Sequence, residues 1–231
     1  MGFFEQYRVL LRKDLTREFR SKEMLSSMGI YALLVLVVYG AALSQTSKGL
    51  DILQMSGGLI WALIVFTSML GLNRSFAFEK EQGCLEGILL APIDRSTIFL
   101  SKATSNCLFL LVVELITVPL FAFFFLGGVT LAPSWPLIVF PLLLGSIGIA
   151  GVGTLLSTIT LETRGKDVLL AVLFVPLLFP LVYACVAATT GCMVGSEGFM
   201  TTYLRSLLLA GGYDIIMLSL SWALYDFVIS A

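Results

Sequence analysis

The chain of 231 residues contains no histidine. Histidine is the commonest general base, metal ligand and haem ligand in proteins, so its absence removes the usual routes to these functions. The sequence also has no G-x-x-x-x-G-K-[ST] phosphate loop and no G-x-S-x-G nucleophile elbow. We therefore expect no catalytic residues, no nucleotide hydrolysis by this chain and no haem held through imidazole.

Cysteine is also scarce, and its spacing argues against a metal site. The four cysteines, Cys84, Cys107, Cys185 and Cys192, form no C-x-x-C or paired pattern, so zinc is not expected. Cys185 and Cys192 both lie toward the non-cytoplasmic side of the membrane in the topology that the basic residues predict below. They could form a disulfide in an oxidising compartment or remain two buried thiols, and the sequence leaves both possibilities open.

Charged residues make up only 13% of the chain, against 58% hydrophobic residues, which is too apolar for a water-exposed globule. A membrane-spanning helix needs about 20 mostly apolar residues. Continuous apolar runs of this length exclude a β-barrel and predict an all-α integral membrane protein in the lipid bilayer, with no nucleic-acid partner. The six predicted spans are Met24–Leu43, Met55–Leu72, Ala103–Leu126, Trp135–Thr160, Val168–Thr189 and Ser206–Ile229.

Basic residues indicate which side of the membrane each loop occupies, because cytoplasmic loops are enriched in Lys and Arg. Six precede the first span, four lie in the segment 74–102, and two follow the fourth span, which makes twelve of the fourteen. Only Lys48 and Arg205 fall on the other side. The pattern predicts that both termini are cytoplasmic, which agrees with an even number of spans.

Residues 1–23 form a separate predicted unit ahead of the six-span domain at 24–231. Phe4, Tyr7, Leu11, Leu15 and Phe19 recur at helical spacing, which predicts an amphipathic helix in the cytoplasmic membrane interface, with its basic residues available to anionic lipid headgroups. A cleaved signal peptide is the alternative. The length of this segment and its four acidic residues argue against that alternative.

Polar and helix-disrupting residues occur within the spans. A glycine series in the fourth span and two prolines in the fifth indicate close packing of membrane helices, which tolerate both residue types. Glu114 falls near the middle of the third span, where a charge in lipid costs on the order of 3 kcal/mol. It could line a translocation route or subunit interface, or be a neutral carboxyl bonded to Ser, Thr or Asn. Asp214 lies near the outer end of the sixth span, where we expect it to reach interfacial water.

The segment 74–102 differs from its apolar neighbours. Its apolar residues Leu85, Ile88 and Leu89 would lie on one side of a short helix that ends at Pro92. Asp94 can then cap a new helix that continues into the third span. The result is a short cytoplasmic helix between two spans, which could be a re-entry device or a contact surface for a partner.

The order "GLIW", residues 58–61, followed by "LNRSFAFEKEQGCLEGILLAP", residues 72–92, resembles the CcmB or haem-exporter B family of cytochrome c maturation permeases. The matching features are the pair Gly58 and Trp61, the Arg-x-Phe of Arg74 and Phe76, the Gly-x-Leu-Glu that begins at Gly83, and Pro92. The segment "LLRKDLTREFRSKE", residues 10–23, resembles the basic N-terminal helix of the same family.

The resemblance implies a multi-pass, six-helix ABC-2-type permease of the bacterial inner membrane, whose cytoplasmic loop docks on a separate ATPase that binds ATP. It assigns this coupling role to seven residues of the loop: Glu79, Glu81, Gly83, Leu85, Glu86, Ile88 and Leu89. It also implies further partners: a second permease copy, a haem-handling membrane subunit, a small membrane helix protein and a periplasmic haem chaperone. In this family ATP is thought to drive release of the haem-loaded chaperone, so the complex, and not this chain, would handle haem.

Two other functions fit the same residues. An ABC-2 exporter of a lipid, polysaccharide or drug would share the six spans and the loop. A membrane scaffold without a transport cycle would share the spans but would need no ATPase. Association with an ATPase therefore separates the scaffold from the two permeases, and the cargo separates the permeases from each other.

Overall fold

The computed structural model describes residues 2–44, 52–81, 94–127, 131–160, 166–195 and 198–230, and all regular structure in these ranges is helical. Six helices are long and apolar enough to cross a membrane. The predicted all-α membrane fold is therefore confirmed. The helices are α1 (Phe3–Ser21), α2 (Glu23–Ser44), α3 (Ile52–Glu81), α5 (Arg95–Phe125), the short 3-10 helix η1 (Trp135–Ile138), α6 (Val139–Thr160), α7 (Lys166–Val194) and α8 (Phe199–Ser230).

Each predicted span corresponds to one long helix, but several helices continue beyond the apolar run. Helix α3 ends at Glu81 instead of Leu72, and α8 begins at Phe199 instead of Ser206. Helix α5 begins at Arg95, directly after Asp94, whose carboxylate accepts a hydrogen bond of 3.0 Å from the backbone N–H of Ser96. The predicted helix cap at Asp94 is therefore present. Backbone hydrogen bonding continues a helix past the point where its side chains cease to be apolar.

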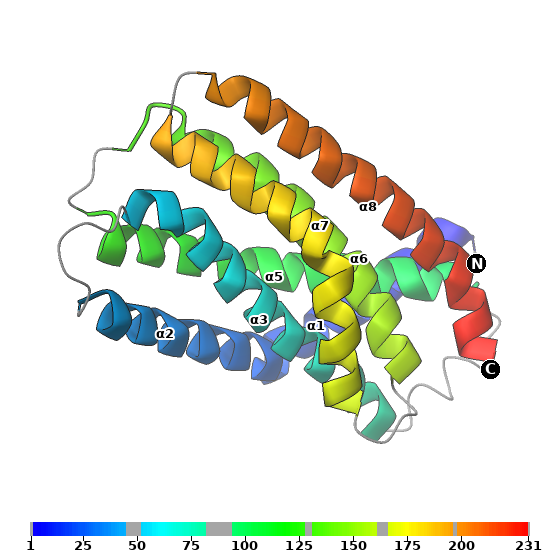
Figure 1. Ribbon diagram of the computed structural model, residues 1–231. Coiled ribbons are helices and arrows are strands. Elements are labelled where there is room, and N and C mark those ends of the chain that lie inside the picture. The colour runs from blue at the N-terminus through cyan, green and yellow to red at the C-terminus, as the bar shows by residue number, and fades with distance from the viewer. Residues whose placement is uncertain are drawn as a thin grey trace.

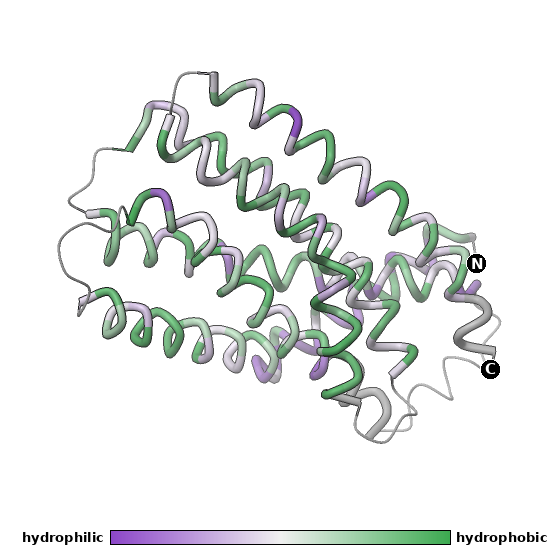
Figure 2. The backbone as a smooth tube through the Cα atoms, viewed as in Figure 1, coloured by the Kyte–Doolittle hydropathy of each residue, from purple (hydrophilic) through white to green (hydrophobic). Residues whose placement is uncertain are grey.

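The six long helices form a bundle, and α1 crosses one end of it near both chain termini (Figure 1). Helix α6 packs against α3, α5, α7 and α8, so it occupies the centre. Helices α3 and α6 are the most buried of the six, whereas α2 and α8 are the least buried. Hydrophobic residues dominate the long helices, and hydrophilic residues gather on α1 (Figure 2).

Glycines in α6 let its neighbours approach closely, as the sequence predicted. A Cβ atom at Gly145 would collide with the ring of Trp61 from α3, and one at Gly153 would collide with Leu72. At Gly148 the neighbours are Leu181 of α7 and the carboxylate of Asp214. The absence of side chains at these positions of α6 is therefore what allows α3, α7 and α8 to surround it.

Candidate functional site

A buried ion pair joins α1 to α5. Lys102 Nζ lies 3.2 Å from Asp14 Oδ2, and the two side chains are 3% and 2% exposed. Lys13 Nζ lies 3.3 Å from the other carboxylate oxygen of Asp14 and is itself partly exposed. Because buried charges are costly unless they are paired, this contact strongly favours one position of α1 on the bundle.

A second acidic residue of α1 fixes the corner between α1 and α2. The backbone N–H of Leu25 donates a hydrogen bond of 2.8 Å to Glu18 Oε1, so the carboxylate caps the N-terminus of α2. Lys22 between the two helices adopts a left-handed conformation with φ of 54°, and its N–H bonds to the Glu18 carbonyl at 2.7 Å. The corner is therefore a compact, hydrogen-bonded joint.

The face of α1 that packs on the bundle differs from the predicted apolar stripe. Its buried residues are Leu10, Asp14 and Glu18, whereas Phe4 and Phe19 are 83% and 66% exposed. Phe4 and Phe19, at the two ends of the predicted stripe, thus point away from the protein, whereas Tyr7, Leu11 and Leu15 between them are half-buried. Asp14 and Glu18 lie four residues apart on a helix rich in basic residues, and this spacing was the sequence signal for the packing face. The ion-pair partner of Asp14, Lys102, is too distant in sequence for a local pattern to reveal.

The start of α5 has two further contacts with α1. Tyr7 donates a hydrogen bond of 3.1 Å to Thr104 Oγ1. The backbone N–H of Asp94 lies 3.5 Å from Gln6 Oε1, a longer contact. Together with the Asp14 ion pair, these contacts attach the first turns of α5 to α1.

The predicted coupling segment begins on α3 and extends beyond the described residues. Phe76, Glu79 and Glu81 lie in the last turns of α3, where the helix is described but these side chains are not. The short coupling helix and its residues lie outside the described residues: Gly83, Leu85, Glu86, Ile88, Leu89 and Pro92. On the described side, Arg74 of α3 forms an exposed ion pair of 3.0 Å with Glu23 of α2.

Glu114 of α5 lies in the interior of the bundle. It is 3% exposed, and Ser146 of α6 donates a hydrogen bond of 2.7 Å to its Oε1. A hydrogen bond to serine was one of the contacts expected if Glu114 is a carboxyl bonded within the bundle. Its second oxygen has no hydrogen-bond partner among the described residues. A neighbouring α5–α6 contact not anticipated from sequence joins Asn106 to Thr154 at 3.0 Å.

Asp214 does not reach interfacial water, so that expectation was wrong. It is 4% exposed, because α8 begins at Phe199 and carries this residue about four turns into the helix. The side chain lies against Gly148 of α6, and within the described part of the chain neither carboxylate oxygen has a hydrogen-bond partner. Asp214 and Glu114 therefore place two acidic side chains against the central helix.

Trp61 is a packing residue at the junction of three helices. It is fully buried in α3, its ring covers Gly145 of α6, and its indole N–H donates a hydrogen bond of 2.9 Å to Thr189 of α7. Gly58 is exposed, and no described side chain approaches it, whereas the preceding Gly57 faces Thr190 of α7 closely. Of the adjacent glycine pair, Gly57 is therefore the one that the packing requires.

The described residues contain no group of three His, Cys, Asp or Glu side chains that could hold a metal ion. Cys185 and Cys192 are both buried free thiols, which resolves the two possibilities left open by the sequence. Cys185 lies near the Pro141 carbonyl oxygen at 3.7 Å. The described arrangement thus offers hydrogen-bonded helix joints and two buried carboxyls, and no cluster of metal ligands among the described residues.

Comparison with known proteins identifies the family that the chain matches. A family model described as "CcmB protein" matches residues 5–224. Among similar proteins, "Heme exporter protein B" of Pseudomonas aeruginosa is 26% identical over 174 residues, which cover 75% of this chain and 76% of that protein. Proteins with the same name from Paracoccus denitrificans and Rhodobacter capsulatus are each 26% identical, over 71% and 75% of this chain and 74% and 77% of their own lengths.

Proposed function

The chain belongs to the CcmB family, and we propose that it is the permease subunit of an ABC transporter complex for cytochrome c maturation. The observation that carries the proposal is the family match over residues 5–224, together with relatives named as heme exporters. Six apolar helices long enough to span a membrane agree with a permease. The match favours this function over the general exporter and the scaffold that also fit the sequence.

In this proposal a partner ATPase supplies the energy, because the chain has no phosphate-loop motif. The complex then uses ATP hydrolysis for haem delivery or for release of a haem-loaded periplasmic chaperone. The proposed partners are those of the family: a second permease copy, a haem-handling membrane subunit and a small membrane helix protein. The proposed location is the bacterial inner membrane, with both termini in the cytoplasm.

We assign ATPase coupling to residues 79–91, and the neighbouring helices support this assignment mechanically. The helix before the segment, α3, is tied to α2 through Arg74 and Glu23. The helix after it, α5, is tied to α1 through Lys102 and Asp14. A displacement applied to α3 or α5 next to the segment would therefore also act on the helix attached to it, α2 or α1.

Affinity purification of the tagged chain from native membranes, with identification of its partners, tests the proposal. We expect an ABC ATPase subunit to co-purify with the wild type. A triple variant with Glu79→Lys, Glu81→Lys and Glu86→Lys should reach the membrane in equal amounts but lose ATPase association or ATP-dependent activity, because charge reversal at an interface replaces attraction with repulsion. Normal association and activity of the triple variant would remove coupling from this segment.

The proposed orientation has its own test. A single cysteine placed at Lys80, in a variant whose native cysteines are replaced, should not react with a membrane-impermeant thiol reagent in intact cells. It should react after the membrane is permeabilised. Labelling from outside intact cells would reverse the orientation.

A further inference from the structure

Helix α1 has three distinct faces. The buried face carries Leu10, Asp14 and Glu18, and the apolar face carries Phe4 and Phe19. At 3.6 residues per turn, roughly 120° separates these two faces around the helix axis. A similar angle separates the buried face from the third, basic face. The buried face is held by the ion pair to α5 and the cap on α2. The other two faces point away from the bundle because their rotation is fixed by these contacts.

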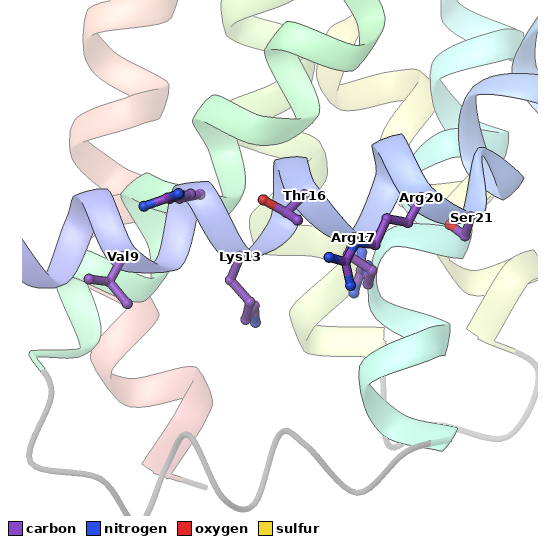
Figure 3. Close-up of a pocket in the computed structure, with 7 residues that line it drawn as sticks. Val9, Lys13, Thr16, Arg17, Arg20 and Ser21 are labelled. Carbon is purple, nitrogen blue, oxygen red and sulfur yellow. The ribbon is translucent and has the colours of Figure 1, made fainter.

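The basic face lines a groove of about 660 Å³ along α1 (Figure 3). It is bordered by the apolar Val9 and by two kinds of polar side chain, the basic Arg12, Lys13, Arg17 and Arg20 and the hydroxyl-bearing Thr16 and Ser21. Arg12 and Arg20 are exposed. Guanidinium and hydroxyl groups together are the donors that recognise phosphate oxygens, because arginine offers several N–H groups in a planar fork.

We propose that this groove binds the phosphate headgroup of an anionic phospholipid, such as phosphatidylglycerol. The adjacent apolar face distinguishes this ligand from a soluble anion or an acidic protein surface. Phe4 and Phe19, 83% and 66% exposed, need an apolar environment next to the phosphate, and a phospholipid carries its acyl chains there. The cost of exposing these two rings to water is removed when the helix lies at the membrane surface.

The site is also built to hold its position. An ordinary interfacial helix can rotate and slide along the lipid surface, whereas α1 is fixed to the bundle by Asp14 and Glu18. The groove is thus pre-organised and presents its donors in one direction, which reduces the entropy lost on binding. The result is a defined lipid site on the permease and not only a general attraction to negative membranes.

Native mass spectrometry of the full-length chain tests the site. The protein is equilibrated with equal amounts of phosphatidylglycerol and phosphatidylcholine that have identical acyl chains, and the ratio of retained lipids is measured. An exposed basic residue near an anionic membrane contributes about 1 kcal/mol, or about a fivefold change in binding. We expect Arg12→Gln and Arg20→Gln each to lower the ratio about fivefold, and the double variant to lower it more than tenfold.

Three control variants separate this site from a general effect of positive charge or of membrane affinity. Arg205→Gln removes an arginine at the other end of the bundle and should leave the ratio unchanged. The charge-retaining pair Arg12→Lys and Arg20→Lys should keep most of the preference. Phe4→Ser with Phe19→Ser should reduce retention of both lipids without changing their ratio, because the apolar face does not recognise charge.

Two results would overturn the proposal. One is a folded Arg12→Gln, Arg20→Gln protein, with wild-type circular dichroism, that retains the full preference for phosphatidylglycerol. The other is complete displacement of the lipid by soluble glycerol 3-phosphate, which would make the groove a site for free phosphate compounds. Should the double variant fail to fold, the single variants Arg12→Gln and Arg20→Gln decide the matter against Arg205→Gln, since each must lower the ratio about fivefold while Arg205→Gln leaves it unchanged.

Discussion

Replacing Lys102 by methionine tests whether the buried ion pair holds α1 on the bundle. Methionine has a similar length and no charge, so it keeps much of the packing while it leaves Asp14, 2% exposed, without its cation from α5. Removal of one member of a buried pair costs about 3–5 kcal/mol. Since Lys13 lies 3.3 Å from the same carboxylate and offsets part of this loss, we expect α1 to lose about 3 kcal/mol of docking free energy.

Hydrogen exchange in lipid nanodiscs measures this loss directly. A change of about 3 kcal/mol corresponds to about two powers of ten, so the central amides of α1 should exchange about 100-fold faster in Lys102→Met. Amides in the central helix α6 should keep their wild-type rates. The double variant Asp14→Leu, Lys102→Met should recover most of the protection, because an apolar pair can replace a buried ion pair at little cost.

Arg74→Gln supplies the matched control, because it breaks an ion pair between two helices that is exposed instead of buried. Such pairs contribute about 1 kcal/mol or less, so exchange near the start of α2 should rise less than about fivefold. The reasoning fails if α1 in Lys102→Met is as well protected as in the wild type. It also fails if the double variant is no better protected than the single one.

Three further expectations concern the bundle interior and haem. Gly145→Ala should destabilise the protein by about 1–3 kcal/mol in detergent unfolding assays, because its methyl group meets Trp61, whereas Gly211→Ala, with no described neighbour within 4 Å, should be nearly neutral. Ser146→Ala should cost on the order of 1–2 kcal/mol in the same assay, because it removes the donor to Glu114. Absorption spectra of the purified subunit mixed with haem should lack a bis-histidine signature, since the chain has no histidine.

The six spans were predictable because each depends on a local property, the length of an apolar run. The start of α5 was also predictable, since Asp94 caps a helix through its own neighbouring backbone. The last residue of α3 and the first residue of α8 were not predictable, because backbone hydrogen bonds continue both helices beyond their apolar runs. Helix boundaries at a membrane surface are set by capping and packing as well as by hydropathy.

The orientation of buried polar residues could not be predicted from local patterns. Asp14 lies inward because Lys102, far away in sequence, provides the opposite charge. Helix α8 starts before its apolar run, so Asp214 lies well inside the helix. Its side chain faces Gly148 of α6 in the bundle interior. Glu114 could be singled out from sequence because it falls near the middle of an apolar span. Serine was among the partner types expected for it, and Ser146 is the partner that the structure shows. Coupling through residues 79–91 stays a prediction.

The distance in sequence between α1 and its partners on α5 imposes an order of assembly on the growing chain. Tyr7 and its partner Thr104 are 97 residues apart, and at about 5–20 residues per second a ribosome needs roughly 5–20 seconds to add that length. During this interval α1 exists without its docking surface, and the Asp14 carboxylate stays in contact with water. Synthesis of Lys102 is therefore the event that allows the first helix of the chain to become one of the last to be put in place.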